Sequence, residues 1–150
     1  MKKIISLLFL LIIITGCSKP NGTLICTTTT NPIEGTTISS KYIATYKNNY
    51  VTNLKTIEKI TVGKKSDLDL YKEKIEELYK DYKDIKYYKN KISIKNKTLT
   101  STTTINYKKI DTNKLIEIAP GNKNIIEDGK VPIDKVKDYY TSNGFNCKKR

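Results

Sequence analysis

Apolar and polar residues alternate along several stretches of the chain, and this pattern is typical of strands that bury one face. Residues 37–46 place most of their apolar side chains at positions of one parity, and the Thr-rich residues 23–30 before them suit a pleated strand. Asn48 and Asn49 tolerate the positive φ angles of a tight hairpin turn. The chain is therefore expected to return as a third strand over residues 50–62.

Apolar residues at spacings of three and four predict a helix over residues 66–82, because this spacing puts them on one side of an α-helix. They are Leu68, Tyr71, Ile75, Leu78 and Tyr82. Ser66 is expected to cap the first turn of this helix. A second helix is expected over residues 133–143, since Pro132 stands near its start and Gly144 follows its end.

The remaining segments predict a second hairpin over residues 85–107, with its turn at Asn96 and Lys97. A short helix is expected over residues 111–118 and a short last strand over residues 145–148. Hairpins followed by amphipathic helices indicate an α+β fold. We expect an antiparallel sheet of about five or six strands with two helices packed on one face.

Residues 1–16 are expected to be a signal peptide, separate from the fold. Two lysines precede an apolar run interrupted by one serine, and this run is too short to span a bilayer as a helix. Ile14, Thr15, Gly16 and Cys17 follow it and resemble the lipobox of bacterial lipoproteins. The resemblance implies cleavage between Gly16 and Cys17 and a diacylglyceryl group on the Cys17 thiol.

The chain then divides into a signal peptide (residues 1–16), a lipidated cysteine with a short tether (residues 17–22) and a single α+β domain (residues 23–150). The N-terminal lipid would hold this domain on the extracytoplasmic face of the cell membrane. Loss of the signal peptide leaves 26 Lys and Arg against 15 Asp and Glu, a net charge of +11. Such a charge favours anionic partners. Outside the cell these are anionic lipid or a cell-wall polymer such as teichoic acid, and not nucleic acid; the lysines equally suit a solvated surface.

Two cysteines remain in the exported domain. Cys26 and Cys147 form an even pair in an oxidising location, and a bond between them would join the first and last strands. Two free thiols or a redox pair are the alternatives, although the chain contains no Cys-x-x-Cys spacing. We expect the structural disulfide.

Candidate catalytic chemistry is sparse. Histidine is absent, which excludes a Ser/His/Asp or Cys/His nucleophile and the commonest general base and metal ligand. Glu127 and Asp128, with Asp134 nearby, are the tightest acidic group. They suit an exposed turn, with a weak Ca²⁺ site or carboxylate acid–base chemistry as alternatives. We expect no catalytic residue, metal or cofactor.

A group of tyrosines is interleaved with lysines at residues 79–89. Tyr79, Tyr82, Tyr87 and Tyr88 are expected at a helix edge and in the strand core, and stacking on sugars or bases is the alternative. These observations favour a non-enzymatic binding or structural module of the envelope whose ligand and protein partners the sequence does not name. A carboxylate-dependent envelope enzyme, such as a glycan hydrolase, is the alternative.

The layout as a whole resembles the YehR-like family of small bacterial lipoproteins. The matching features are the Thr-Gly-Cys of the lipobox, the early strand with Cys26, the two hairpins, the helix after the first hairpin and the closing helix-to-strand segment at residues 140–145. The resemblance implies an α+β fold and a lipid anchor. It supplies no catalytic residues, because the function of the family is uncharacterised.

Overall fold

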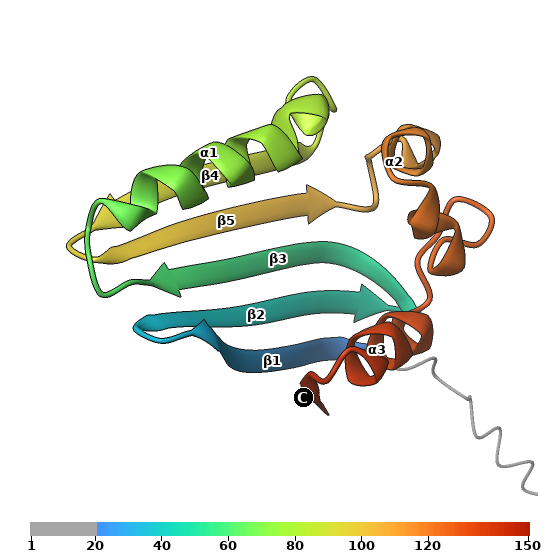
Figure 1. Cartoon of the computed structure of the whole chain (residues 1–150). Helices are drawn as coiled ribbons and strands as arrows, with labels where there is room; N and C mark the ends of the chain where they lie inside the picture. Colours follow the sequence, from blue (N-terminus) through green and yellow to red (C-terminus); the bar gives the residue numbers. More distant parts are fainter. Residues whose placement is uncertain (1–20) are drawn as a thin grey trace, which may run out of the picture.

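The computed structural model describes residues 21–150. The predicted signal peptide, cleavage point and Cys17 lipidation fall outside this part of the chain. Six antiparallel strands form one sheet in the spatial order β4-β5-β3-β2-β1-β6, so the predicted α+β class and antiparallel sheet are confirmed (Figure 1). The strands are β1 (Gly22–Ile33), β2 (Thr36–Lys47), β3 (Tyr50–Thr61), β4 (Tyr88–Lys95), β5 (Thr98–Asn106) and β6 (Asn146–Lys149).

Tight turns that contain asparagine connect the two strands of each predicted hairpin. Asn48 and Asn49 have φ angles of 54° and 69°, and both positive values fit the twist of a two-residue hairpin between β2 and β3. Asn96 has a φ of 55° at the turn between β4 and β5. Asparagine tolerates this region better than most residues, so the local sequence fixes where each hairpin turns.

Three α-helices occur in residues 21–150. The sequence predicts two helices packed on one face of the sheet. The three helices are α1 (Asp67–Tyr79), α2 (Thr112–Ile118) and α3 (Ile133–Ser142), and two 3₁₀ turns add η1 (Lys80–Tyr82) and η2 (Pro120–Asn124). The expected short helix is α2, and its Asp111 cap accepts a hydrogen bond from the Asn113 N–H at 3.1 Å.

The first predicted helix differs in detail from α1. It ends at Tyr79 and tightens into η1 over its last turn. The Ser66 cap is wrong, because this residue has helical backbone angles and its hydroxyl contacts the Asp67 carboxylate instead of a backbone N–H.

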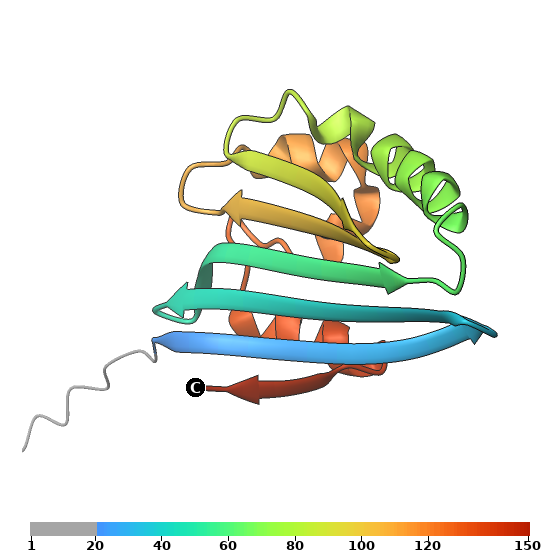
Figure 2. The ribbon, with the colours of Figure 1, turned by 90° about the vertical axis from the view of Figure 1, so that its left-hand side faces the viewer.

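Strand alternation gives the sheet two faces of different character. Leu24, Cys26 and Ala44 are buried beneath the helices, and their neighbours in β1 and β2 point to the opposite side. In Figure 2 α2 and α3 lie behind the strands and α1 lies beside them at the upper right, so no helix crosses the near side. We call the side under the helices the covered face and the other side the open face.

The helices bury two separate groups of apolar residues. The larger group lies beneath α2 and α3, where Leu24, Val131 and Ile133 are at most 1% exposed. The smaller group lies beneath α1 and joins Leu68 to Leu99. The core is therefore divided.

Polar residues occupy the covered face between the two groups. Thr56, Ser101 and Thr103 are buried there, and the Asn90 amide donates to the Ser101 hydroxyl at 3.0 Å and to the Thr103 hydroxyl at 2.9 Å. Tyr42 and Glu58 lie beside them, since Tyr42 pairs with Thr56 across the sheet. We call these residues the polar strip. Hydrogen bonds satisfy this strip, and it gives a helix little apolar surface to bury.

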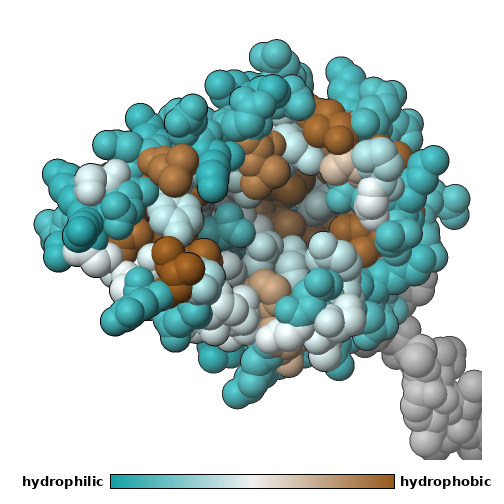
Figure 3. Space-filling view, in the orientation of Figure 1, coloured by the Kyte–Doolittle hydropathy of each residue, from teal (hydrophilic) through white to brown (hydrophobic). Residues whose placement is uncertain are grey.

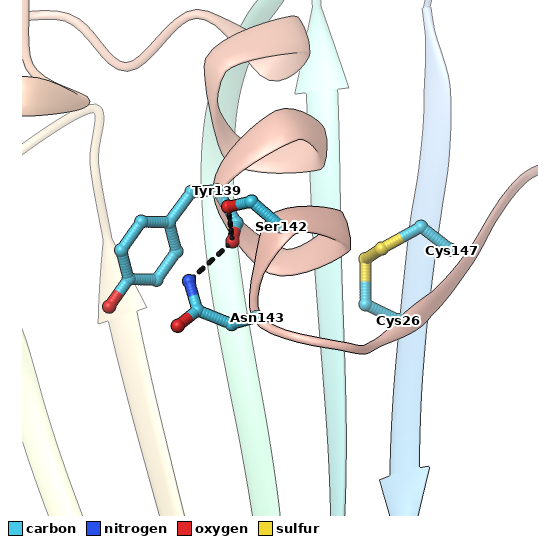
Figure 4. The surroundings of a disulfide bond; sticks show 5 residues. All are labelled: Cys26, Tyr139, Ser142, Asn143 and Cys147. Atoms are coloured by element: carbon cyan, nitrogen blue, oxygen red, sulfur yellow. Dashed lines mark hydrogen bonds between the residues drawn. A yellow bond between two sulfur atoms is a disulfide. The ribbon is translucent and has the colours of Figure 1, made fainter.

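A Schellman motif ends α3 and turns the chain into β6. Gly144, with φ of 80°, donates to the Thr141 carbonyl at 3.1 Å, and Phe145 donates to the Tyr140 carbonyl at 3.0 Å. The Ser142 hydroxyl and the Asn143 amide also bond the Tyr139 carbonyl (Figure 4). The predicted role of Gly144 as the residue after the helix is confirmed.

The last strand then pairs with the first. Cys26 and Cys147 are directly opposite each other in the β1–β6 ladder, with Cα atoms 4.0 Å apart and their sulfurs bonded (Figure 4). Thr23 and Arg150 exchange two hydrogen bonds three positions away in the ladder. Because bonded and non-bonded pairs alternate along antiparallel strands, the cysteine pair is a non-hydrogen-bonded one, where opposite side chains lie closest. The structure thus places the two predicted partners at bonding distance. None of the helices at residues 21–150 is long and apolar enough to cross a membrane.

We expect the Cys26→Ala/Cys147→Ala variant to unfold at lower denaturant concentration than the native chain. The bond closes a loop with a sequence separation of 121 residues. A loop of this length is worth about 2–5 kcal/mol of unfolding free energy. Urea titrations with and without reductant measure the difference. Reductant should lower the stability of the native chain and leave the variant unchanged, and a native chain indifferent to reductant would contradict the bond.

Candidate functional site

A cleft opens on the covered face between α1 and α3, above β3, β5 and the start of β4. Its volume is about 420 Å³, within the usual range for small-ligand sites. Figure 3 shows this side of the molecule hollowed near its centre, with apolar residues in the depth of the hollow. The fifteen lining residues include six tyrosines, two asparagines and several aliphatic residues. Although 29% of the chain is charged, none of these fifteen is.

One wall of the cleft is a cluster of three tyrosines from α1, η1 and β4. The rings of Tyr82 and Tyr88 stack with centroids 4.8 Å apart, and Tyr79 stands edge-on to Tyr82 at 6.2 Å. Such offset and edge-to-face contacts are favourable for aromatic rings. Each ring therefore restricts the others, and the wall is preformed.

The opposite wall is a second aromatic cluster, centred on α3. Tyr140 packs against Tyr42 of β2 at 4.2 Å, against Phe145 at 5.2 Å and against Tyr139 at 5.3 Å. The Schellman turn holds Phe145 in this position. Tyr139 is 50% exposed, and Leu78 across the cleft is 63% exposed, so both project at its rim.

Hydrogen bonding orients the base of the second wall. The Tyr42 hydroxyl donates to the Glu58 carboxylate at 3.2 Å, within the polar strip. This contact ties the Tyr42 ring to β3 and supports Tyr140 above it. Glu58 is thus committed to a structural bond at the edge of the cleft and does not belong to its lining.

Burial raises the pKa values of the cleft phenols above their ordinary value. Desolvation raises the pKa of Tyr107 to about 12 and also raises the pKa values of Tyr88 and Tyr140. The pKa of Tyr42 is raised mainly by desolvation and further by the adjacent Glu58 carboxylate. These hydroxyls are therefore uncharged hydrogen-bonding groups at physiological pH.

The structure brings together three of the four tyrosines that the sequence singled out. Tyr79, Tyr82 and Tyr88 line the cleft. Their rings are partly buried, at the end of the helix and in the strand where they were expected. Tyr87 has a φ of 72° and turns away, where the Lys86 and Lys109 ammonium groups lie 5.2 and 5.5 Å from its ring. Tyr87 lies just before β4, and its positive φ accompanies this change of direction.

The acidic group of the last loop occupies an exposed turn, as expected. Glu127 and Lys130 exchange two backbone hydrogen bonds of 2.8 Å around Asp128 and Gly129, whose positive φ angles define a tight turn. Glu127 pairs with Lys135, and Asp134 pairs with Lys149 at 2.7 Å. No group of three or more potential metal ligands occurs in residues 21–150.

Sequence reasoning missed the second wall. Tyr139 and Tyr140 read as part of an amphipathic helix, and nothing local shows that Tyr42 lies beneath them. The adjacent Tyr-Tyr pair was the available signal, since two aromatic residues in succession cannot both face the core of one helix. Tyr107 and Leu54 were equally hidden, because only the sheet order places them in the cleft.

Comparison with known proteins adds information about the fold. No family model and no curated protein matches the chain. The NMR structure of the E. coli YehR protein is similar, with a TM-score of 0.59 and 22% identity over 86% of this chain and 91% of that one. An NMR structure of a protein from Streptococcus pneumoniae TIGR4 gives a TM-score of 0.57 and 15% identity over 99% of this chain and 97% of that one. The chain therefore has the fold of YehR, which agrees with the resemblance at that level.

We expect the stability of the domain to fall as the pH rises above about 10, where unfolded tyrosine ionises. The folded pKa of Tyr107 is raised to about 12, so the stabilisation from its neutral form is complete below pH 10 and is lost between 10 and 12. Urea titrations across this range measure the loss, and tyrosinate absorbance follows the ionisation. A Tyr107→Phe variant should lose less stability over the same range. A native chain of constant stability there would contradict the buried phenols.

Proposed function

We propose that this protein is a lipid-anchored extracytoplasmic lipoprotein of the YehR-like family whose domain binds a neutral ligand without catalysis. The lining of the cleft carries the binding role. Six tyrosines and no charged residue surround it, in a chain that is otherwise rich in lysine. A charged ligand would find no counter-ion there, whereas an uncharged ligand with apolar faces fits.

Glycan chains have this chemistry. A sugar ring presents C–H faces that pack on aromatic rings and hydroxyl edges that bond phenols and amides. Tyr82 and Tyr139 offer rings from opposite walls, and Asn122 and Asn124 lie at the same cleft. The sequence offers stacking on sugars as an alternative role for the tyrosines at residues 79–89, and the cleft geometry favours this role.

A glycan hydrolase is the second candidate, and it needs two carboxyl groups roughly 5–9.5 Å apart around the bond that is cleaved. The cleft lining contains no carboxylate. Glu58 is bonded to Tyr42, and Glu127 and Asp134 are paired with lysines. The carboxylates that a hydrolase requires do not converge on the cleft, which supports binding over catalysis.

The lipid anchor rests on the lipobox and the apolar run before it. The described domain begins its first strand at Gly22, so only a short segment separates the sheet from Cys17. Five residues span at most about 18 Å when extended. An anchored domain would therefore lie against the membrane and within reach of wall glycans.

We expect a fatty-acid analogue fed to cells that express the full chain to label the protein at Cys17. A Cys17→Ala variant should lose the label and leave the membrane fraction, because the thioether would be its attachment. A Cys26→Ala variant, which keeps the lipobox, should retain the label. Label persisting on the Cys17→Ala variant would end the anchor proposal.

We expect N-acetylglucosamine oligomers to bind the native protein, with Tyr82→Ala and Tyr139→Ala each lowering the affinity by about 2–10-fold. Calorimetric titration measures the affinity. Tyr50→Ala is the matched control, since Tyr50 is an exposed tyrosine outside the cleft. Equal losses in Tyr50→Ala and the cleft variants would contradict a cleft site. Release of shortened oligomers that stops in a Glu58→Gln, Glu127→Gln, Asp128→Asn or Asp134→Asn variant would establish the hydrolase instead.

A further inference from the structure

The open face of the sheet carries charge of one sign. Within residues 21–150, its charged strand positions are all lysines, and all are exposed. They are Lys41, Lys47, Lys55, Lys59, Lys89, Lys91, Lys95 and Lys148. Strand register places them together, because each lies one residue away from a position that faces the helices.

The carboxylates lie elsewhere. Of the 15 Asp and Glu, 13 are in residues 67–138, among the helices and their loops and outside β4 and β5. Glu34 lies in the turn between β1 and β2, and Glu58 faces the covered side beside Tyr42. The four ion pairs found in residues 21–150 involve Lys72, Lys80, Lys135 and Lys149, none of which is on the open face. Opposite charges therefore balance on the helix side and do not balance on the sheet.

The lysines are spread over an area and do not follow a line. They occupy β2, β3, β4 and β6, and six strands at about 4.8 Å per interval make a width of about 24 Å. Threonine and serine hydroxyls fill many positions between them, including Thr27, Ser39 and Thr104. Ammonium and hydroxyl groups distributed in this way match a planar array of phosphate groups better than they match a single polymer chain.

We propose that the open face docks on the anionic phospholipid headgroups of the membrane that holds the protein. This proposal rests on the proposed lipid anchor, because a diacylglyceryl group would hold the domain at the bilayer, where each lysine near the surface adds attraction to anionic headgroups. The short segment before Gly22 keeps the sheet within reach of the headgroups. Since the cleft lies on the covered face, docking turns its opening away from the membrane and toward the wall.

Vesicle binding by a chain of residues 21–150 tests the docking independently of the anchor. This chain keeps the whole sheet, both core groups and the disulfide, and it lacks Cys17. It should bind vesicles of phosphatidylcholine with phosphatidylglycerol at low salt, should ignore phosphatidylcholine alone, and should release as salt rises. Absence of binding at low salt would overturn the docking, while fatty-acid label on Cys17 would still uphold the anchor.

Two triple charge reversals locate the binding face. Lys55→Glu/Lys59→Glu/Lys91→Glu should weaken vesicle binding on the order of 100-fold, at about fivefold for each lysine near the surface. Lys74→Glu/Lys114→Glu/Lys123→Glu makes the same change in net charge on exposed helix-side lysines, and it should bind nearly as the native domain does. Equal losses in both variants would show that net charge acts alone and would overturn the proposal. Tight binding to purified teichoic acid with none to the vesicles would also overturn it.

Fluorophores report the orientation of the full lipidated chain in vesicles with nitroxide-labelled headgroups. A probe at Thr104→Cys on the open face should be quenched, and a probe at Asn124→Cys by the cleft should not. The reverse pattern would place the cleft against the membrane and would contradict the docking.

Discussion

The separation of α1 from α3 depends on one constraint, which is that the covered face is apolar at its two ends and polar across its middle. A helix gains stability by burying an apolar stripe. Helix α1 therefore packs on the smaller apolar group, and α3 packs on the larger one. The polar strip satisfies its own hydrogen bonds through Asn90, Ser101 and Thr103. A helix placed over this strip would bury polar groups for little apolar contact. The space between α1 and α3 consequently stays open, and the cleft lies beside the polar strip, over Leu54 and Ile105.

The walls of this space are held by different means. The Schellman motif at Gly144 fixes the end of α3, and the chain continues at once into β6, where Cys147 joins Cys26. The wall that contains Tyr140 is therefore tied to the sheet both covalently and by the β1–β6 ladder. The other wall follows α1, which ends in η1 and leads into the β4–β5 hairpin, and its tyrosines hold one another by stacking. Both walls are thus formed before any ligand arrives.

The two faces of the sheet differ because strand alternation separates their chemistry. The covered face gathers tyrosines around an uncharged cleft, and the open face gathers lysines without carboxylates. A neutral ligand in the cleft and an anionic surface under the sheet would not compete, since the sheet lies between them (Figure 2). One thin domain would then attach to the membrane on one side and bind on the other.

The sequence by itself determined the local elements and the fold class. Alternation predicted the strands, Asn48 and Asn49 predicted a hairpin turn, Gly144 predicted the end of α3, and the pairing of Cys26 with Cys147 followed once the last strand was placed beside the first. These features depend on residues near one another in the chain or on a simple count.

The tertiary structure decided the number of helices on the sheet and the presence of the cleft. Tyr107 and Tyr140 line one cleft, and Tyr42 packs against Tyr140, only because the tertiary structure brings β2, α3 and the residue after β5 to one region, and no local pattern encodes that arrangement. The gathering of lysines on the open face also depends on the tertiary structure. These lysines are spread along the chain, and they share one face only when the strands pair.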